Sequence, residues 1–287
     1  MELWLIYAIM AAVFAALVGI FTKLGVKDVD ADLATGIRTI VVIIFAFIMV
    51  GITGTGGGIS YISGWTWIFL VLSGLATGGA WLARARALKL GNVNKVTPID
   101  KSSTILTMVL AFIILSEPVG WLTVTGMAMM GFGTWLMIEW KNDAKKGERG
   151  WLIYAALSAC FAAAVAILGR AGVSDMDPTL WTAARMVIVV PLAWLMVFAR
   201  GTQKTIKSID KKSWVFLILS GTATGASWLM FYRALSLGTA SQVVPIDKLS
   251  ILLSMLFAAL ILKEKFTKKS LVGLAFLTLG TLLPILI

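Results

Sequence analysis

The chain has 287 residues, of which 59% are hydrophobic and 14% are charged, and its mean hydropathy is +0.94. This composition is far more apolar than that of a soluble domain and predicts an integral membrane protein. The chain has no histidine and a single cysteine, Cys160, which excludes internal disulfides, histidine-based catalysis and ordinary zinc sites. The net charge of +11 does not indicate nucleic-acid binding, because the basic residues gather between apolar segments, where they report membrane topology.

Ten apolar segments follow one another along the chain, and each is long enough to cross a hydrocarbon layer of ~30 Å as a helix. They cover residues 3–23, 33–53, 65–88, 93–115, 119–140, 151–171, 179–199, 213–235, 240–262 and 269–287. We therefore expect an all-α membrane protein with ten transmembrane helices. The first segment lacks a basic leading region and a small-residue cleavage pattern, so we expect it to be a membrane span rather than a removed signal peptide.

The second half of the chain repeats the first. A shift of 147 residues aligns 4–140 with 151–287 without a gap, and about 60 of the 137 aligned positions are identical. We divide the chain into a first five-helix repeat at 1–140, a charged cytoplasmic linker at 141–150 and a second five-helix repeat at 151–287. Because each repeat has an odd number of spans, the two repeats are expected to be inverted relative to each other in the membrane.

The basic residues are distributed very unevenly between the two sides of this topology. The loops that follow odd-numbered spans hold 19 lysines and arginines, whereas the opposite side holds only Arg170 and Arg233. The positive-inside rule places the rich side in the cytoplasm. We therefore expect a multi-pass protein of the inner cell membrane with both termini outside.

A proline–isoleucine–aspartate–lysine motif stands beside long apolar runs in both repeats, at residues 98–101 and 245–248. Charged groups at such positions are energetically costly in lipid. Their occurrence in both repeats therefore indicates a functional or structural role. In one interpretation the aspartates bind a cationic group or take up a proton, and the lysines attract a carboxylate or keep the aspartates charged. In the other, each motif forms a structural ion pair or a helix cap near the interface. The charged residues are Asp100, Lys101, Asp247 and Lys248.

A polar stripe follows each motif along one face of the expected helix. An aspartate and two hydroxyl groups recur at positions i, i+3 and i+7. The residues are Asp100, Ser103 and Thr107 in the first repeat, and Asp247, Ser250 and Ser254 in the second. Because a polar stripe is unfavourable against lipid, we expect these side chains to face the bundle interior or a wet cavity.

Two arginines lie at matching positions inside apolar segments, Arg38 in the second and Arg185 in the seventh. They are candidates for anion binding, or for contacts between the repeats with an aspartate of the opposite half as partner, or for snorkelling to the interface. Arg86 and Arg233, near the ends of the third and eighth segments, are expected to reach the same region. These four residues complete the basic candidates for substrate binding or gating.

Two tryptophans, Trp81 and Trp228, lie at matching and more central positions of the third and eighth segments. They are candidates for an aromatic wall against a cation or an apolar substrate, and ordinary packing is the alternative. Glycines spaced four residues apart precede both tryptophans and favour close helix packing. These glycines are Gly74 and Gly78 in the first repeat, and Gly221 and Gly225 in the second.

Both repeats share the pattern A-L-x-L-G, then V-x-P-I-D-K, an apolar run ending in L-x-E, and two glycines. In the first repeat the last elements are Leu115-x-Glu117, Gly126 and Gly133. This combination resembles the EamA family of the drug/metabolite transporter superfamily. The P-I-D-K form is similar to that of stand-alone five-span members, which pair antiparallel, and the chain looks like two such units fused. Glu117 and its counterpart Glu264 are expected to cap the ends of the fourth and ninth spans as candidate gate partners.

The resemblance implies a secondary transporter that exports or exchanges a small metabolite, such as an amino acid, an amine or a drug-like compound, by alternating access. It implies a central cavity lined by spans 1–4 and 6–9, with the fifth and tenth spans used for packing. The expected partners are a small-molecule substrate, the lipid bilayer and a proton as coupling ion. A monomer or homodimer is expected, with no cofactor, metal, nucleic-acid partner or enzymatic activity.

Other functions remain as alternatives. A flippase for a lipid-linked substrate is the nearest, and a lateral portal lined with Arg38 or Arg185 would favour it. A membrane enzyme could use Asp100 and Lys101 for acid–base chemistry, but neither a nucleophile–base arrangement nor a metal cluster accompanies them. A structural or receptor-like membrane protein is the remaining alternative.

Overall fold

The computed structural model describes residues 2–25, 29–90, 96, 99, 102–137, 150–261 and 267–286, and all regular structure within these residues is helical. The long helices of the first half are α1 (Leu3–Gly25), α2 (Ala31–Thr53), α3 (Gly64–Leu90), α5 (Ser103–Ile114) and α6 (Trp121–Met137). Those of the second half are α7 (Gly150–Gly172), α8 (Pro178–Arg200), α9 (Lys211–Leu237), α10 (Ala240–Asp247), α11 (Ser250–Ile261) and α12 (Lys268–Leu282). Short 3-10 helices are η1 (Thr55–Tyr61), η2 (Thr202–Ser208) and η3 (Leu283–Leu286).

Seven helical stretches in the described part are long and apolar enough to cross a membrane. They are Leu3–Thr22, Ala31–Thr53, Gly64–Leu88, Gly150–Gly172, Pro178–Arg200, Lys211–Leu237 and Ala240–Phe257. The other three predicted segments correspond to α5, α6 and α12, which have 12, 17 and 15 residues. Within the described residues these helices are shorter than the ~20 residues of a typical span, and most of 91–101 and all of 138–149 lie outside the described part. The described residues thus show seven of the ten predicted spans.

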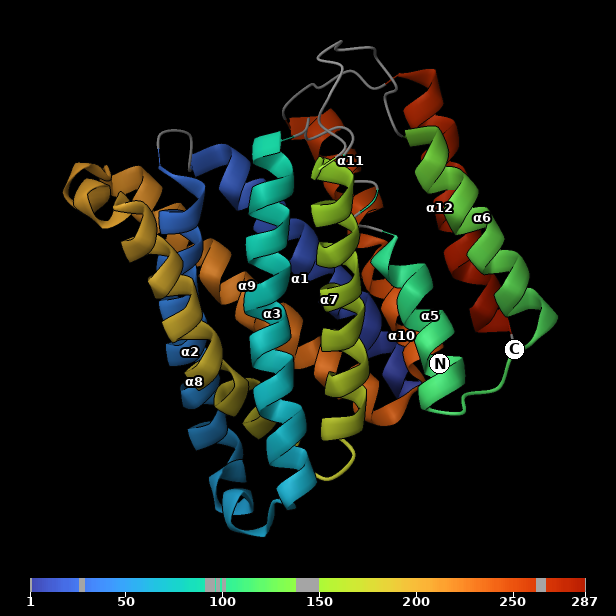
Figure 1. The fold of residues 1–287 in the computed structure, drawn as a ribbon, viewed down its shortest axis with the longest axis horizontal. Coiled ribbons are helices and arrows are strands. Elements are labelled where there is room, and N and C mark those ends of the chain that lie inside the picture. The colour runs from blue at the N-terminus through green and yellow to red at the C-terminus, as the bar shows by residue number, and fades with distance from the viewer. Residues whose placement is uncertain are drawn as a thin grey trace.

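Helices related by the 147-residue shift run in opposite directions (Figure 1). In that view α1 and α3 rise while α7 and α9 descend, and α2 descends while α8 rises. The chain termini lie together at the lower right, and α6 ends and α7 begins at the top. We call these two ends of the bundle the terminus end and the linker end.

The contacts between the halves follow an approximate two-fold symmetry. Helix α1 packs on α9 as α7 packs on α3, and α2 packs on α9 as α8 packs on α3. Helices α2 and α8 contact each other, as do α6 and α12. The two repeats therefore build one bundle in which α1, α2, α3, α7, α8 and α9 form the centre.

The glycine pairs of α3 and α9 lie where these helices cross α8 and α2. A Cβ atom at Gly74 would lie 2.6 Å from the Ile188 side chain, and one at Gly221 would lie 2.6 Å from that of Val41. Ile188 and Val41 are themselves related by the 147-residue shift. The absence of a side chain thus allows close helix approach, in agreement with the packing interpretation of the glycine spacing.

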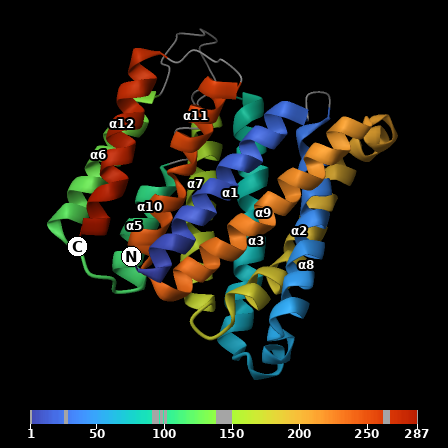
Figure 2. The ribbon, with the colours of Figure 1, turned by 180° about the vertical axis from the view of Figure 1, so that it is seen from behind.

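Helices α6 and α12 pair with each other at one edge of the molecule (Figure 2). A Cβ at Gly126 would lie 2.5 Å from the backbone oxygen of Gly280, and one at Gly133 would lie 2.5 Å from that of Gly273. The two backbones are in direct contact at both crossings, so glycine is required there.

The second P-I-D-K motif divides the ninth predicted segment into α10 and α11. The N–H groups of Lys248 and Leu249 donate to the carbonyl oxygens of Pro245 and Ile246, at 3.0 and 2.9 Å. These bonds form a tight turn in place of regular α-helix, and Pro245 has no N–H to donate. The motif therefore lies at a helix break inside the segment.

Candidate functional site

A cavity of about 510 Å³ opens among α1, α2, α3, α8 and α9. It is lined by Ala15, Val18, Ala31, Asp32, Thr35, Arg38, Thr39, Val42, Trp81, Arg84, Ala85, Leu88, Ala193, Met196, Thr224, Ser227 and Trp228. The lining residues of α2 come from its first half, and those of α1, α3 and α8 from their second halves. Because α2 begins and the other three helices end at the linker end, the cavity reaches from that end to the middle of the bundle. Its volume suits a small-molecule ligand.

Three of the described residues that line the cavity are charged: Asp32, Arg38 and Arg84. Asp32 forms an ion pair with Arg200, which ends α8 at the linker end. Arg38 donates a hydrogen bond to the Thr35 hydroxyl on its own helix at 3.3 Å. Within the described residues, Asp32 is therefore matched by Arg200, whereas Arg38 has a hydroxyl as its partner.

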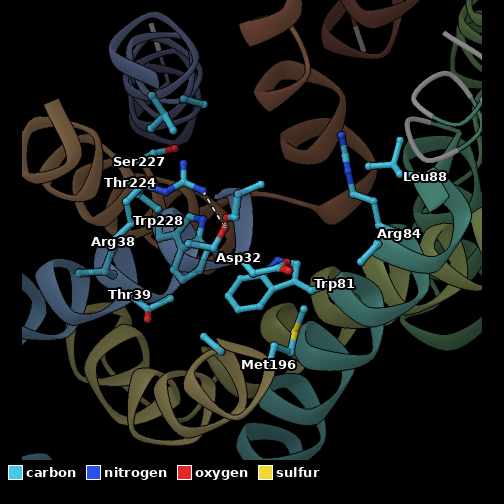
Figure 3. Close-up of a pocket in the computed structure, with 17 residues that line it drawn as sticks. Asp32, Arg38, Thr39, Trp81, Arg84, Leu88, Met196, Thr224, Ser227 and Trp228 are labelled. Carbon is cyan, nitrogen blue, oxygen red and sulfur yellow. Dashed lines mark hydrogen bonds between the residues drawn. The ribbon is translucent and has the colours of Figure 1, made fainter. Parts of the chain in front are cut away.

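Two tryptophans from opposite repeats form part of the wall. Trp228 of α9 lies with Arg38, Thr224 and Ser227 on one side of the cavity, whereas Trp81 lies toward Arg84 on the other (Figure 3). Indole rings offer apolar faces together with a negative quadrupole. The cavity thus combines apolar walls with a small number of polar groups.

Arg185, which occupies the position of Arg38 in the second repeat, has a different environment. Its side chain is 2% exposed, and its guanidinium carbon lies 4.5 Å from the centre of the Trp228 ring and 5.2 Å from that of Tyr232. Its Nη1 donates to the Thr77 hydroxyl at 2.8 Å. The partner from the opposite half is therefore a hydroxyl group, where the sequence had indicated an aspartate.

Aromatic side chains close the terminus end around Arg185. Trp181 and Tyr232 are 0% and 2% exposed, and their ring centres are 6.1 Å apart. Tyr232 packs directly on Gly169, and Trp181 on Gly172. The bundle is thus sealed at one end and open at the other.

The equivalent positions at the linker end carry small residues. The shift of 147 residues relates Trp181 to Ala34 and Tyr232 to Ala85. Ala85 lines the cavity. An alanine in place of a large ring leaves space, which explains why the same architecture is open at this end.

Arg86 and Arg233 lie away from the cavity. The guanidinium of Arg86 stacks on Tyr154 of α7, 5.9 Å from the ring centre. Arg233 is 3.8 Å from the carboxylate of Asp177, and its side chain is 47% exposed. Both arginines are therefore placed at the edges of the bundle and not beside Arg38 or Arg185.

The second P-I-D-K motif forms a local ion pair. Lys248 Nζ lies 3.0 Å from Asp247 Oδ2, and both side chains are partly exposed. Asp100 and Lys101 of the first motif lie outside the described residues. The geometry of Asp247 and Lys248 agrees with the structural ion-pair interpretation.

The hydroxyl groups of the polar stripes do not line the 510 Å³ cavity. Ser103 and Thr107 are buried, and the Thr107 hydroxyl donates to the Ser103 carbonyl at 2.8 Å. Ser250 begins α11, and Ser254 faces Gly19 of α1. Of the sequence candidates that the structure describes, Arg38, Trp81 and Trp228 line the cavity.

Glu117 binds a different helix end from the one expected. Its two carboxylate oxygens accept hydrogen bonds from the N–H groups of Ala240 and Ser241, at 2.6 and 2.9 Å. It therefore caps the beginning of α10 in the opposite repeat instead of the end of the fourth span. Glu264 lies outside the described residues.

Several cavity residues were missed by the sequence analysis. Asp32, Thr35 and Thr39 share the cavity with Arg38, and residues 31, 35, 38, 39 and 42 fall on one helical face of α2. Arg84 is one of the 19 basic residues on the lysine- and arginine-rich side and has no further signal in the sequence. A helical projection through Arg38 would have found the α2 residues, whereas Thr224 and Ser227 carry no comparable pattern.

Comparison with known proteins identifies the family that the chain matches. The model of the EamA-like transporter family matches residues 2–139 and again residues 149–286. A curated relative named as an uncharacterized transporter in the cobO 3′ region of Sinorhizobium sp. is 41% identical over 136 residues, which are 47% of this chain and 96% of the relative. One solved structure, described only as the crystal structure of a protein, matches with a TM-score of 0.84 over 99% of this chain and 96% of that chain. At 14% identity this last likeness concerns the fold alone.

Proposed function

Since the chain belongs to the EamA-like transporter family and is a multi-pass membrane transporter, we propose that it is a secondary carrier. It moves a small metabolite across the inner cell membrane by alternating access. Ten spans in two inverted repeats, at 1–140 and 151–287 with a cytoplasmic linker at 141–150, are part of this proposal. Helices α5, α6 and α12 would complete the seven long spans.

One observation carries the proposal: two equivalent arginines occupy opposite states. Arg38 faces an open cavity, whereas Arg185 is sealed under Trp228 and Tyr232. A carrier built from inverted repeats exchanges the conformations of its two halves when it switches. The contacts of Arg185 therefore describe what Arg38 does in the other state.

The second state follows from the 147-residue shift. Arg38 stacks on Trp81 and donates to Thr224, as Arg185 now stacks on Trp228 and donates to Thr77. Trp81 and Thr224 already line the cavity with Arg38. In that second state groups that now face the same cavity come into contact, while Ala34 and Ala85 stand where Trp181 and Tyr232 close the terminus end.

The charge distribution supports an orientation with the linker end in the cytoplasm and both termini outside. In this orientation the cavity faces inward and can receive substrate from the cell. We propose export or exchange, with a proton as the candidate coupling ion. A lateral portal lined with Arg38 or Arg185 would favour a lipid flippase; Arg185 is 2% exposed, which does not support such a role for this residue.

A reversible lock tests the proposal. The Thr66 hydroxyl of α3 donates to Asp175, between α7 and α8, at 3.3 Å, which joins the two halves at the terminus end. We therefore expect Thr66→Cys with Asp175→Cys, in a Cys160→Ala background, to form a disulfide that holds this end closed. Purified protein in liposomes is assayed for uptake of a panel of labelled amines, amino acids, organic acids and sugar phosphates.

We expect at least one solute of the panel to be taken up, the oxidant to stop its uptake, and a reductant to restore it. The single variants Thr66→Cys and Asp175→Cys, treated in the same way, serve as controls and are expected to keep their uptake. Uptake that continues through the disulfide-linked protein would contradict alternating access, as would a failure to move any solute.

A further inference from the structure

We propose that the cavity binds a small organic anion, namely a carboxylate with an apolar or aromatic body and without a cationic group. Arg38 anchors the carboxylate, and Trp81 and Trp228 enclose the body. This inference rests on the proposed transport function and names the substrate class of its cavity.

The charge of the cavity supports an anion. Within the described residues, Arg38 makes one side-chain hydrogen bond, at 3.3 Å to Thr35, and no ion pair. A guanidinium away from bulk water gains most from a charged, hydrogen-bonding partner. Its planar fork presents parallel N–H donors that match the two oxygens of a carboxylate.

The hydroxyl groups of the cavity leave anion binding to arginine. Thr35 donates to the Ala31 carbonyl at 2.8 Å, Thr39 to Gly36 at 2.7 Å, and Thr224 to Ser220 at 2.7 Å. Ser227 donates to the Ala11 carbonyl at 2.9 Å. Because a hydroxyl has one proton to donate, all four groups present acceptor lone pairs to the cavity. Among these lining residues, the donors that an anion needs therefore come from Arg38.

The same arrangement disfavours amines and zwitterions. Among the described residues that line the cavity, Asp32 is the one carboxylate, and Arg200 already forms its ion pair. An ammonium group beside Arg38 would therefore face a positive charge, and no free carboxylate of the described lining would receive it. Such like-charge placement weakens binding, so an amine or amino acid is a poorer ligand than the matching acid.

The apolar residues that line the cavity indicate which uncharged part of a ligand would fit there. Trp81, Trp228, Val42 and Met196 line the space around Arg38, and the cavity volume is about 510 Å³. Indole rings give extensive apolar contact and pack well with other rings. A phenyl or indole group joined to the carboxylate by a short chain fits both the size and the chemistry.

Four compounds with the same phenyl group test the charge preference. They are 3-phenylpropionate, its neutral amide, the amine phenethylamine and the zwitterion phenylalanine. Binding to the detergent-purified full-length protein is read as a shift in melting temperature, because aromatic acids cross lipid unaided in their protonated form. We expect 3-phenylpropionate to raise Tm by roughly 2–4 °C at about ten times its Kd, and the other three to give smaller shifts.

Variants then assign the anchor. Arg38→Gln is expected to weaken 3-phenylpropionate binding about tenfold or more, and Arg38→Lys to retain part of the affinity, since it keeps the charge but loses the fork. Arg86→Gln removes an equal charge from α3, outside the cavity, and this variant is expected to bind as the unmodified protein does. Each variant is compared with its own ligand-free Tm, which separates lost folding from lost binding.

The proposal is overturned if phenethylamine or the amide stabilises the protein as much as the acid does, if Arg38→Gln and Arg38→Lys both bind the acid normally, or if the acid gives no shift. If another solute is still transported and the disulfide lock still blocks it, the substrate class alone is wrong. If the disulfide between the cysteines at positions 66 and 175 no longer blocked transport, the proposed alternating-access mechanism would be contradicted instead.

Discussion

Equivalent residues of the two repeats show how the same local sequence takes two environments. Arg185 is buried and holds the hydroxyl of Thr77, whereas Arg38 faces the cavity with Thr224 nearby. Thr77 and Thr224 are themselves related by the 147-residue shift. The arginine and threonine are therefore the same in both sites, and the sites differ in the conformation of the bundle and in Trp181 and Tyr232, which have alanine counterparts.

Replacing each threonine by valine tests this difference. In Thr77→Val a buried guanidinium loses an acceptor, which we expect to destabilise the protein by roughly 1–3 kcal/mol. Thr224→Val removes a hydroxyl that does not bind an arginine here, so its effect should stay below about 1 kcal/mol. Thermal melting of the two purified variants measures both. Equal losses, or a larger loss for Thr224→Val, would contradict the assignment of Arg185 as the sealed arginine.

The candidate site could be predicted only in part from the sequence. Arg38, Trp81 and Trp228 stood out because charge and large aromatic groups inside apolar segments are unusual. Asp247 and Lys248 stood out for the same reason, yet they pair with each other at a helix break. Sequence gives the cost of a charge in lipid, but not whether a neighbouring side chain or a ligand compensates it.

Among the helices, length and hydropathy were reliable where a segment is straight and continuous. The predicted segments that correspond to α1, α2, α3, α7, α8 and α9 agree with the observed helices within two residues at both ends. The ninth segment was predicted as continuous, but it breaks at Pro245–Lys248 because the turn there replaces α-helical bonds. Hydropathy averages over such a break and does not register it.

The pairing of α6 and α12 depends on glycine at defined positions. A Cβ at Gly133 would meet backbone atoms of α12 at 2.5 and 2.7 Å, whereas one at Gly131 would meet only the end of the Ile105 side chain, at 3.3 Å. Backbone atoms cannot move aside as a side chain can. The two glycines are therefore expected to differ in their tolerance of alanine.

We expect Gly133→Ala to destabilise the protein by roughly 1–3 kcal/mol, because it forces α6 away from α12. Gly131→Ala should be neutral or stabilising by up to about 1 kcal/mol, since alanine favours helix over glycine. Melting of both variants in the same detergent provides the comparison. A Gly133→Ala variant as stable as Gly131→Ala would show that α6 and α12 do not pack through their backbones.

For the molecule as a whole, matched surface segments carry different charges. The 3-10 helices η1 and η2 have the same length, follow Gly54 and Gly201 with φ of 66° and 71°, and lie at opposite ends of the bundle (Figure 1). Helix η2 contains Lys204 and Lys207, whereas η1 has glycines and no charge. The same fold thus bears the positive charge at the linker end.

The proposed orientation, with the linker end in the cytoplasm, is based on this asymmetry and can be measured directly. In a Cys160→Ala background, Gly57→Cys of η1 should react with a membrane-impermeant maleimide in intact cells. Lys204→Cys, at the matching position of η2, should react only after the membrane is opened. Both residues are exposed. The reverse pattern would place the linker end outside and turn the inward-facing cavity into an outward-facing one.

The central claim is that one arginine site opens as its counterpart seals. Thr35 is partly exposed in the cavity beside Arg38, and its counterpart Thr182 is fully buried beside the seal. The most direct measurement is the thiol reactivity of Thr35→Cys and Thr182→Cys, each in a Cys160→Ala background, with and without transported solute. We predict that Thr35→Cys reacts from the cytoplasmic side at rest, and that solute lowers its reactivity while raising that of Thr182→Cys from the outside. A Thr182→Cys thiol that stays protected while solute is being transported would contradict alternating access.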